Sequence, residues 1–392
     1  MSFLSSVAVL ILCSLLLGSV FRRLRLPPLI GMLLCGILTG PYVLKLLAPD
    51  LLAISSDLRQ FALIVILTRA GLSLDLSDLR RVGRPAILLC FLPACFEIAG
   101  YVLFAHLFLG LSAAEGALMG AVMAAVSPAV VVPRMLRLQA EGYGTDKGIP
   151  QMITAGASCD DVFVIVLFTA LLAMNRTGEF DFSILWRVPA SILTGIAVGA
   201  LAGVLFTLLL RKVAVRDTVK LLLFLSVSFL LIGLETLISE TVPFSGLLAV
   251  ISLGVAFRFR DKTRAEHLSA RFGKLWVFAE LLLFALVGAQ VDLSYAVSFG
   301  ARLLPVVLLS LLFRMVGVFV CVLGTPLRFR ERLFCAIAYL PKATVQAAIG
   351  GIALSAGLAC GNLILTCAVL AILLTAPLGA LLIDTTYKRL LG

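Results

Sequence analysis

FEIAG at residues 96–100 and FRMVG at residues 313–317 are the stretches of this sequence that decide its fold. Each places one charged side chain, Glu97 or Arg314, three positions before a glycine within a long apolar segment. The two charges differ in sign and lie 217 residues apart. Because an ionised group inside an apolar segment is costly unless it has a partner, we expect the two segments to meet.

A second pair of matching segments has the same separation. LSLDLS and AQVDLS contain Asp75 and Asp292, which are also 217 residues apart. VSPAVVVP around Pro128 then corresponds to LPKATVQ around Pro341. A repeated offset predicts that the chain consists of two duplicated halves. Because proline removes a backbone donor and clashes with the preceding turn, Pro128 and Pro341 predict a broken helix in each half.

The composition identifies the environment of these segments. Of the 392 residues, 61% are hydrophobic and 14% are charged, and the mean hydropathy is +1.14. Soluble domains are about 45–50% apolar and about a quarter charged, so a soluble enzyme, a disordered protein and a nucleic-acid-binding protein are excluded. We therefore predict an all-α polytopic membrane protein in a lipid bilayer.

Apolar runs between the charge clusters predict about thirteen transmembrane helices, since a crossing helix needs about 20 mostly apolar residues. The predicted segments cover residues 3–20, 26–47, 55–73, 84–109, 114–136, 150–175, 186–210, 218–234, 239–257, 268–290, 300–323, 331–355 and 361–383.

The distribution of charge over the loops predicts the topology. Every second loop, starting with the first, together with the C-terminus holds 24 of the 32 Lys and Arg residues, and the opposite loops hold five. Cytoplasmic loops are the ones enriched in Lys and Arg, so the N-terminus is expected outside and the C-terminus in the cytoplasm. The segments around Glu97 and Arg314 then cross in opposite directions. Inverted repeats with broken helices are typical of secondary transporters.

Five ionisable residues are predicted to lie near one depth in the membrane. Each is about ten to fourteen residues from an end of its span, or about 15–20 Å along a helix. Charged residues at such depth usually mark ion pathways or proton relays. The five are Glu97, Asp160, Asp161, Arg314 and Lys342.

Three acids and two bases leave one carboxylate without a fixed counter-ion. A buried carboxylate of this kind binds either a proton or a metal cation. When both compete for one carboxylate, a cation that enters from one face displaces the proton. After the cation has left, the carboxylate takes up a proton at the other face. The sequence therefore predicts a secondary active transporter that exchanges a monovalent cation, Na⁺ or Li⁺, for protons by alternating access.

Asp160 and Asp161 are the predicted metal ligands and proton carriers, with divided roles. Neighbouring residues on a helix point about 100° apart, so the two carboxylates cannot face one cavity in the same way. One is expected to bind the cation or proton, and the other to pair with Lys342 or Arg314. The pair of Glu97 and Arg314, at equivalent positions of the two halves, is either purely structural or part of the mechanism.

Oxygen ligands suit a small hard cation. Hydroxyl groups that could supply them belong to Ser127, Thr154 and Ser158, and Pro128 is expected to free backbone carbonyl groups nearby. Each hydroxyl is at least as often bonded within its own helix or to a neighbour.

The chain resembles the monovalent cation:proton antiporter superfamily, and within it the NHA-type sodium/proton exchanger branch. The similarity rests on SPAVVVPRML, on SCDD at 158–161, on the FR at 313–314 and on YLPKATVQAAIG at 339–350. One departure is Ser127-Pro128-Ala129, where many sodium/proton antiporters have Thr-Asp-Pro. This departure fits the NHA-type branch and leaves the contribution of this segment to ion coordination open.

The resemblance implies the sodium/proton antiporter fold, in which a six-helix core contains two crossed broken helices. It further implies that Asp161 is the main ion-binding group, that Asp160 assists it, and that Lys342 and Arg314 balance their charge. A dimerisation domain, homodimers and elevator-type alternating access are implied as well, without any cofactor beyond the transported ions.

We expect one integral membrane unit over residues 1–392. The first repeat, the ion-translocating half, is expected at 50–175 and the second inverted repeat at 266–392. Residues 1–49 and 176–265 are expected to provide linker and dimerisation spans. The membrane is predicted to be the inner or plasma membrane of a bacterium.

Other functions fit the sequence less well. A sodium-coupled organic anion symporter has a related inverted architecture, but it would need more polar and aromatic groups around a larger cavity. A channel would need a repeated filter-like segment, and an enzyme would need a motif such as HExxH or GxSxG. The nine cysteines lie in apolar runs without a CxxC pair, and only two histidines occur, which argues against a zinc or histidine-built metal site.

Overall fold

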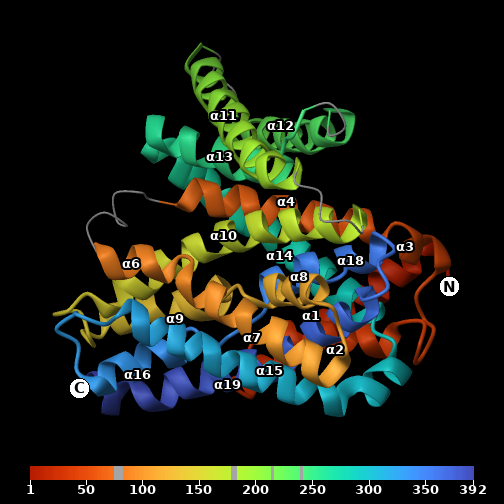
Figure 1. Ribbon diagram of the computed structural model, residues 1–392. Helices are drawn as coiled ribbons and strands as arrows, with labels where there is room; N and C mark the ends of the chain where they lie inside the picture. The colour runs from red at the N-terminus through yellow and green to blue at the C-terminus, as the bar shows by residue number, and fades with distance from the viewer. Residues whose placement is uncertain (75–82, 178–182, 213–215, 239–241) are drawn as a thin grey trace. The chain divides into compact units, whose positions relative to one another are not determined.

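The computed structural model describes residues 1–74, 83–177, 183–212, 216–238 and 242–392. The regular secondary structure of these residues is entirely helical, as predicted, and no strand occurs among them (Figure 1). The helices are α1 (Phe3–Arg23), α2 (Pro28–Thr39), α3 (Pro49–Ala53), α4 (Ser55–Ser73), α6 (Arg84–Leu89), α7 (Leu92–Leu109), α8 (Ala113–Met123), α9 (Pro128–Ala140), α10 (Ile149–Thr177), α11 (Ser183–Lys212), α12 (Asp217–Ile238), α13 (Gly246–Arg260), α14 (Lys262–Ala289), α15 (Leu293–Cys321), α16 (Phe329–Ala338), α17 (Thr344–Gly350), α18 (Ile352–Ser355) and α19 (Gly361–Leu391).

Each of the thirteen predicted segments contains a helix or a broken set of helices. Among the described residues, eight helices are long and apolar enough to cross a membrane, and a bent pair, α8 with α9, makes a ninth. Segments such as 26–47 and 239–257 contain shorter helices, α2 and α13. The multi-pass architecture is confirmed, whereas thirteen crossings stay a prediction.

The chain forms two compact units. The first unit comprises Met1–Ser56, Ser77–Arg176 and Leu281–Gly392, and the second comprises Asp57–Leu76 and Thr177–Glu280. Every side chain that the sequence analysis proposes for the ion site belongs to the first unit. The boundaries predicted for the two repeats and the dimerisation spans stay predictions.

In the first unit, α7 and α15 pack side by side along much of their length (Figure 1). A Cβ atom on Gly100 would lie 3.0 Å from the Cα atom of Ser310, and one on Gly317 would lie 2.9 Å from the Cα atom of Pro93. The 217-residue offset relates Gly100 to Gly317 and Pro93 to Ser310, so the two contacts are equivalent and the helices meet in a symmetric way. The missing side chains bring the backbones close enough for Glu97 to reach Arg314.

Both predicted broken helices are present in the first unit. The chain bends by 40° between α8 and α9, and Pro128 is the first residue of α9, where its missing N–H has no helical acceptor to lose. The second break, residues 339–343, separates α16 from α17 and contains Pro341. Val126 and Tyr339, one from each break, belong to an apolar cluster with residues of α6, α9, α10, α15, α16 and α19.

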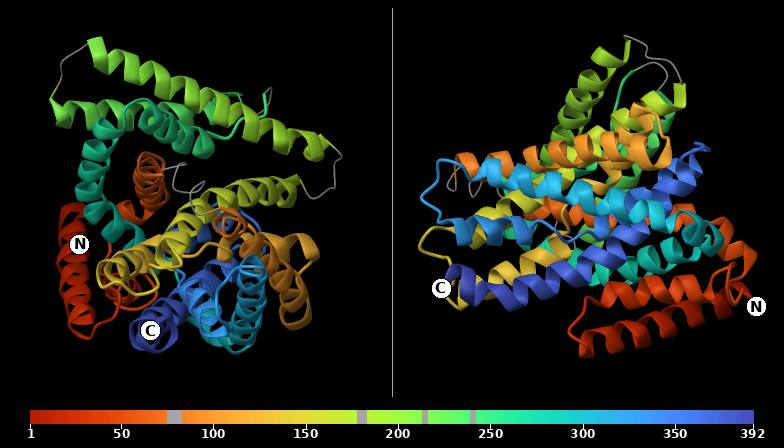
Figure 2. Two further views of the ribbon diagram at one scale, coloured as in Figure 1. Left: turned by 90° about the vertical axis from the view of Figure 1, so that its left-hand side faces the viewer. Right: turned by 60° about the horizontal axis from the view of Figure 1, so that its bottom comes forward.

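Figure 2 shows α1 beside α2 in the first unit.

Asp75 and Asp292 are the acids of the second pair of matching segments. Asp75 lies outside the described residues, and Asp292 is the N-cap of α15. Its carboxylate accepts hydrogen bonds from the backbone N–H groups of Ser294 at 2.9 Å and Tyr295 at 3.4 Å. The Ser294 hydroxyl donates to the same carboxyl at 2.6 Å and holds the pKa of this exposed group below its usual value.

In the second unit, α11 runs along α13 (Figure 2). A Cβ atom on Gly199 would lie 2.7 Å from the Cα atom of Ala249, so the two backbones approach closely. Phe224 of α12 packs edge-to-face against Phe206 at 5.1 Å and Phe257 at 5.7 Å between ring centroids. This aromatic group joins α11, α12 and α13 into one core.

We expect the substitution Gly317→Ala to lower the thermal unfolding midpoint of the detergent-purified protein. The new Cβ atom would lie 2.9 Å from the Cα atom of Pro93 and 3.1 Å from the Cβ atom of Phe96. Overpacking of this kind costs about 1–3 kcal/mol, which exceeds the gain of about 1 kcal/mol in helix propensity.

Gly300→Ala on the same helix is the matched control, because a Cβ atom there meets nothing within 4 Å. This variant should unfold at the same temperature as the parent or slightly above it. If the two alanine variants behave alike, close packing at Gly317 does not limit stability.

Candidate functional site

The guanidinium group of Arg314, on α15, lies at the centre of a fully buried ion network. Its Nη1 atom is 2.8 Å from Oε2 of Glu97 on α7, and its Nη2 atom is 2.8 Å from Oδ2 of Asp160 on α10. None of the three side chains is exposed to solvent. The ion pair predicted between Glu97 and Arg314 is therefore present, and of the two bases considered for the aspartates it is Arg314 that pairs with Asp160.

The same guanidinium group satisfies backbone carbonyl groups at both helix breaks. Its Nε atom donates to the carbonyl oxygen of Tyr339 at 2.8 Å, and Nη1 donates to the carbonyl oxygen of Ala124. Proline at position 128 prevents the carbonyl group of Ala124 from accepting the usual helical hydrogen bond four residues on. The carbonyl group that the sequence analysis expects Pro128 to free is thus occupied by Arg314.

The two breaks contact each other directly. The N–H of Ser127 donates to the carbonyl oxygen of Pro341 at 2.8 Å. The side-chain amide of Gln346, on α17, donates to the carbonyl oxygens of Met123 at 3.1 Å and Ala125 at 2.8 Å. Buried backbone groups need such partners, so these bonds fix the two interrupted helices against each other.

Lys342, the other base considered for the aspartates, pairs with Glu97. Its Nζ atom is 2.5 Å from Oε2 of Glu97, and its ion pair in the described part of the chain is with this glutamate rather than with either aspartate. Its own N–H donates to the hydroxyl of Thr375 on α19 at 2.9 Å. Of the two bases predicted as the partner of one aspartate, Arg314 is therefore the one that takes this role with Asp160, whereas Lys342 pairs with Glu97 on α7.

Asp160 and Asp161 have the different environments that their angular separation on α10 predicts. Asp160 accepts the bond from Arg314 and a hydrogen bond from the N–H of Val126 at 2.8 Å. Asp161 is 7% exposed and makes no ion pair or hydrogen bond within the part of the chain that the structure describes. Of the three buried acids, Asp161 is thus the one without a cationic partner.

Several buried oxygen atoms near the breaks and the aspartates have no hydrogen-bond partner among the described residues. They include one carboxylate oxygen each of Asp160 and Asp161, the hydroxyl of Ser127 and the hydroxyl of Tyr339. Buried oxygen atoms of this kind bind water or a small hard cation. No group of three or more His, Cys, Asp and Glu side chains that could hold a resident metal ion occurs in the described residues.

Two further predicted ligands lie on α10. Helical spacing places Thr154 on the face of α10 that carries Asp161, because the two are seven residues, or nearly two turns, apart. Thr154 is half-buried. The side chain of Ser158 lies outside the described residues.

Tyr339, Gln346 and Thr375 are residues of the network that the sequence analysis did not identify. The first two belong to the quoted motif YLPKATVQAAIG, and Gln346 also accepts a hydrogen bond from the N–H of Ala343 at 2.8 Å. The capping-box pattern of Ser or Thr followed by Gln three residues later is incomplete here, because Ala343 is the N-cap, so the sequence does not single out Gln346. Nothing in the sequence indicates that Thr375, in the middle of α19, would bond to Lys342.

We expect Arg314→Lys to lower the free energy of unfolding by about 3–5 kcal/mol, the usual effect of removing one partner from a buried ion pair. A lysine ammonium group is a point charge and cannot reach two carboxylates and two carbonyl groups in different directions. Thermal unfolding of the purified protein measures the effect. Arg302→Lys, on the exposed face of the same helix, should leave the midpoint unchanged. An unchanged midpoint for Arg314→Lys would show that the network contributes nothing to stability.

A double-mutant cycle tests the partner of Lys342. Lys342→Ala and Glu97→Gln should each destabilise the protein, and their effects should be coupled by about 1 kcal/mol or more because the two side chains touch. The cycle of Lys342→Ala with Asp160→Asn should give a smaller coupling. A larger coupling to Asp160 than to Glu97 would contradict the contact at 2.5 Å.

Similarities to known proteins extend over nearly the whole chain. The family described as sodium/hydrogen exchanger, transmembrane, matches residues 7–388. Human sodium/hydrogen exchanger 9B2 is 34% identical over 418 residues, which cover 99% of this chain and 75% of the relative. Mouse sodium/hydrogen exchanger 9B2 is 33% identical over 413 residues, which cover 99% of this chain and 74% of the relative. The structure of the sodium proton antiporter MjNhaP1 from Methanocaldococcus jannaschii matches with a TM-score of 0.86 at 23% identity over 100% of both chains, and this likeness shows the fold.

Proposed function

Since this chain belongs to the sodium/hydrogen exchanger family, we propose that Asp161 is the group for which its two ions compete. The protein is a multi-pass membrane transporter that exchanges sodium ions for protons, and it is not an enzyme. Na⁺ and H⁺ are its substrates, and the family uses no further cofactor. A sodium-coupled organic anion symporter is not favoured, because the relatives are cation/proton exchangers.

The distribution of charge in the buried network supports Asp161 as the ion-binding group. The two bases are occupied by two of the three acids, since Arg314 contacts Glu97 and Asp160 while Lys342 contacts Glu97. Asp161 is left as a buried carboxylate without a fixed cation. Because an uncompensated ionised carboxylate is costly in a medium of low dielectric constant, it must bind a proton or a cation. One group that can hold only one of the two at a time is sufficient for exchange.

Oxygen atoms close to the helix breaks and on α10 are proposed to complete the sodium site. The hydroxyl of Ser127 is buried without a partner among the described residues, and Asp160 keeps one carboxylate oxygen that is not bonded there. Thr154 shares the face of Asp161 on α10, and Ser158 is proposed as a further ligand. Carboxylate, hydroxyl and water oxygens form the kind of ligand set that a small hard cation prefers. On this proposal Asp160 assists while Arg314 keeps it in place.

We propose that the two halves at 50–175 and 266–392 act as inverted repeats around this site. The symmetric packing of α7 against α15 and the presence of one helix break in each half support this assignment. Alternating access would expose Asp161 to each face in turn, by the elevator-type motion that the family resemblance implies. Residues 1–49 and 176–265 are proposed as dimerisation and linker spans of a homodimer. The second compact unit, with its long segment Thr177–Glu280, supports a separate role for the latter region.

The N-terminus is proposed to lie outside and the C-terminus in the cytoplasm. In the second unit, one cavity is lined by residues near the C-terminal ends of α11 and α13 and near the N-terminal ends of α12 and α14. The helix ends that border two loops predicted to be cytoplasmic therefore meet at one cavity, which supports the topology. The plasma membrane of a bacterium stays a prediction, since the relatives reported above come from mammals and an archaeon.

We expect Asp161→Asn to abolish sodium-driven proton movement in everted vesicles or proteoliposomes. Asparagine has nearly the same shape but can neither release a proton nor neutralise a cation. Because the side chain lacks a cationic partner among the described residues, the variant should unfold at nearly the parent temperature. Fluorescence of a pH indicator after sodium addition gives the measurement.

Asp292→Asn is the matched control for this substitution. Asp292 is partly exposed at the N-cap of α15, where asparagine is an equally good capping residue, so transport should be unaffected. Retention of full sodium-driven proton movement by the Asp161→Asn protein would overturn the assignment of the ion-binding group.

A further inference from the structure

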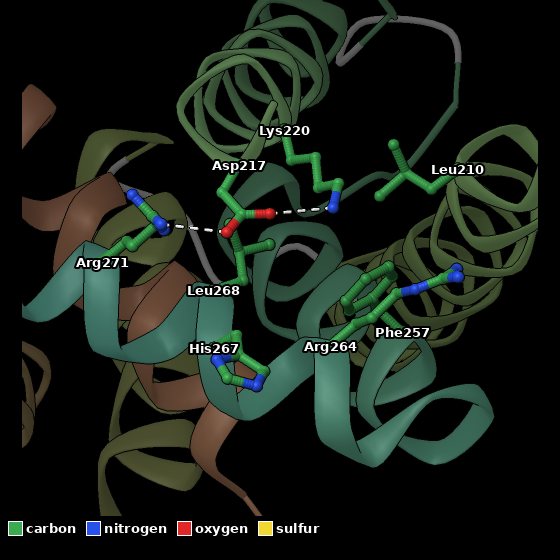
Figure 3. Close-up of a pocket in the computed structure, with 8 residues that line it drawn as sticks. All are labelled: Leu210, Asp217, Lys220, Phe257, Arg264, His267, Leu268 and Arg271. Carbon is green, nitrogen blue, oxygen red and sulfur yellow. Dashed lines mark hydrogen bonds and ion pairs between the residues drawn. The ribbon is translucent and has the colours of Figure 1, made fainter. Parts of the chain in front are cut away.

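A cavity of about 150 Å³ lies in the second unit, separate in sequence and composition from the ion site (Figure 3). It is formed where four helices begin or end: α11 and α13 contribute residues close to their C-terminal ends, and α12 and α14 contribute residues from their N-terminal parts. The residues that line it are Leu210, Asp217, Lys220, Phe257, Arg264, His267, Leu268 and Arg271.

The cavity combines an apolar floor with a basic rim. Leu210, Phe257 and Leu268 are each at most 5% exposed and belong to the core of the second unit. Lys220, Arg264 and Arg271 provide three permanent positive charges, and Asp217 is the one acid among the residues that line the cavity. Such a combination matches a ligand that has an anionic group attached to an apolar body.

Asp217 marks the position that an anionic group would take. Its carboxylate is 2.9 Å from Nζ of Lys220 on α12 and 2.9 Å from Nη2 of Arg271 on α14, as Figure 3 shows. These two cations thus converge on one point from two different helices. All three side chains are partly exposed, so an external anion can reach them and compete with the carboxylate.

The surroundings of the cavity are strongly basic. The segments 211–220 and 258–274 contain ten Lys and Arg residues and three acidic residues, Asp217, Asp261 and Glu266. Both segments lie at the ends of apolar helices that are candidate membrane spans or pack against them, so the cavity is expected at the level of lipid headgroups. Basic pockets between transmembrane helices at the cytoplasmic surface bind anionic lipid headgroups.

We propose that this cavity binds the phosphate group of an anionic phospholipid, with Lys220 and Arg271 as the ligands that replace Asp217 as their partner. The phosphate offers several acceptor oxygen atoms to the two converging donors, and Arg264 adds a third charge at the rim. The apolar floor favours a lipid over free phosphate, because it gives the glycerol and acyl parts a surface to contact. Asp217 acts as an internal competitor that keeps the two cations in place when no lipid is bound.

Lipid-dependent thermal unfolding of the full-length purified protein tests the proposal. Phosphatidylglycerol is added to detergent micelles and compared with phosphatidylcholine at the same mole fraction, and the rise of the midpoint with lipid gives an apparent affinity. Lys220→Gln and Arg271→Gln are each expected to weaken the apparent affinity for phosphatidylglycerol by about tenfold. Asp217→Asn is expected to strengthen it, because the competing carboxylate is removed while the shape of the side chain is kept.

Arg260→Gln is the matched control, because it removes one charge from the same basic segment without lining the cavity. An equal loss of affinity in Arg260→Gln and Arg271→Gln would overturn the proposal in favour of unspecific attraction to a basic surface. Stabilisation by inorganic phosphate alone, equal to that by phosphatidylglycerol, would overturn the assignment of a lipid. Weaker lipid binding in Asp217→Asn would also contradict it. This readout does not involve Asp161, so its outcome is independent of the transport assay.

Discussion

The position of one buried guanidinium group is the constraint on which the ion site depends. Arg314 contacts Glu97, Asp160 and a carbonyl group at each of the two helix breaks, and it is wholly inaccessible to solvent. A guanidinium group so deeply buried needs an acceptor for nearly all of its N–H donors, because removing one partner from a buried ion pair costs several kcal/mol. The planar guanidinium group of an arginine can bind several acceptors at once, since its five N–H donors point in fixed directions. The backbone at both breaks and the acids on α7 and α10 are therefore positioned together.

The network pairs two of the three buried acids with its two bases. Glu97 holds both bases, Asp160 is bonded to Arg314 and to the N–H of Val126, and Asp161 has no such partner among the described residues. Adjacent residues of one helix thus have different surroundings, because a step of about 100° separates them and only Asp160 pairs with Arg314 on α15. A fixed charge pattern around a single unpaired carboxylate is the arrangement that supports the proposed exchange of a sodium ion for a proton at Asp161.

The second unit shows how one set of charges can have two roles. In the sequence, its Lys and Arg residues are explained fully by topology, since cytoplasmic loops of membrane proteins are basic. The fold gathers some of them around a cavity, because the ends of four helices meet there and the aromatic contacts of Phe224 fix three of these helices together. The convergence of Lys220 and Arg271 on one carboxylate depends on this packing and is not visible in a charge count.

The sequence by itself determined the helical membrane architecture, the two breaks, the repeat and the pair of Glu97 with Arg314. Hydrophobicity, proline chemistry and a repeated spacing are local properties, and a buried charge demands an opposite one, so these features can be read from the chain alone. The tertiary structure decided that Lys342 pairs with Glu97 and that Arg314 is the base that takes Asp160. It also decided that the side-chain amide of Gln346 connects one break to the other by hydrogen bonds. Partners of this kind are separated by up to 245 residues, and which donor meets which acceptor depends on the crossing of helices in space rather than on any pattern along the sequence.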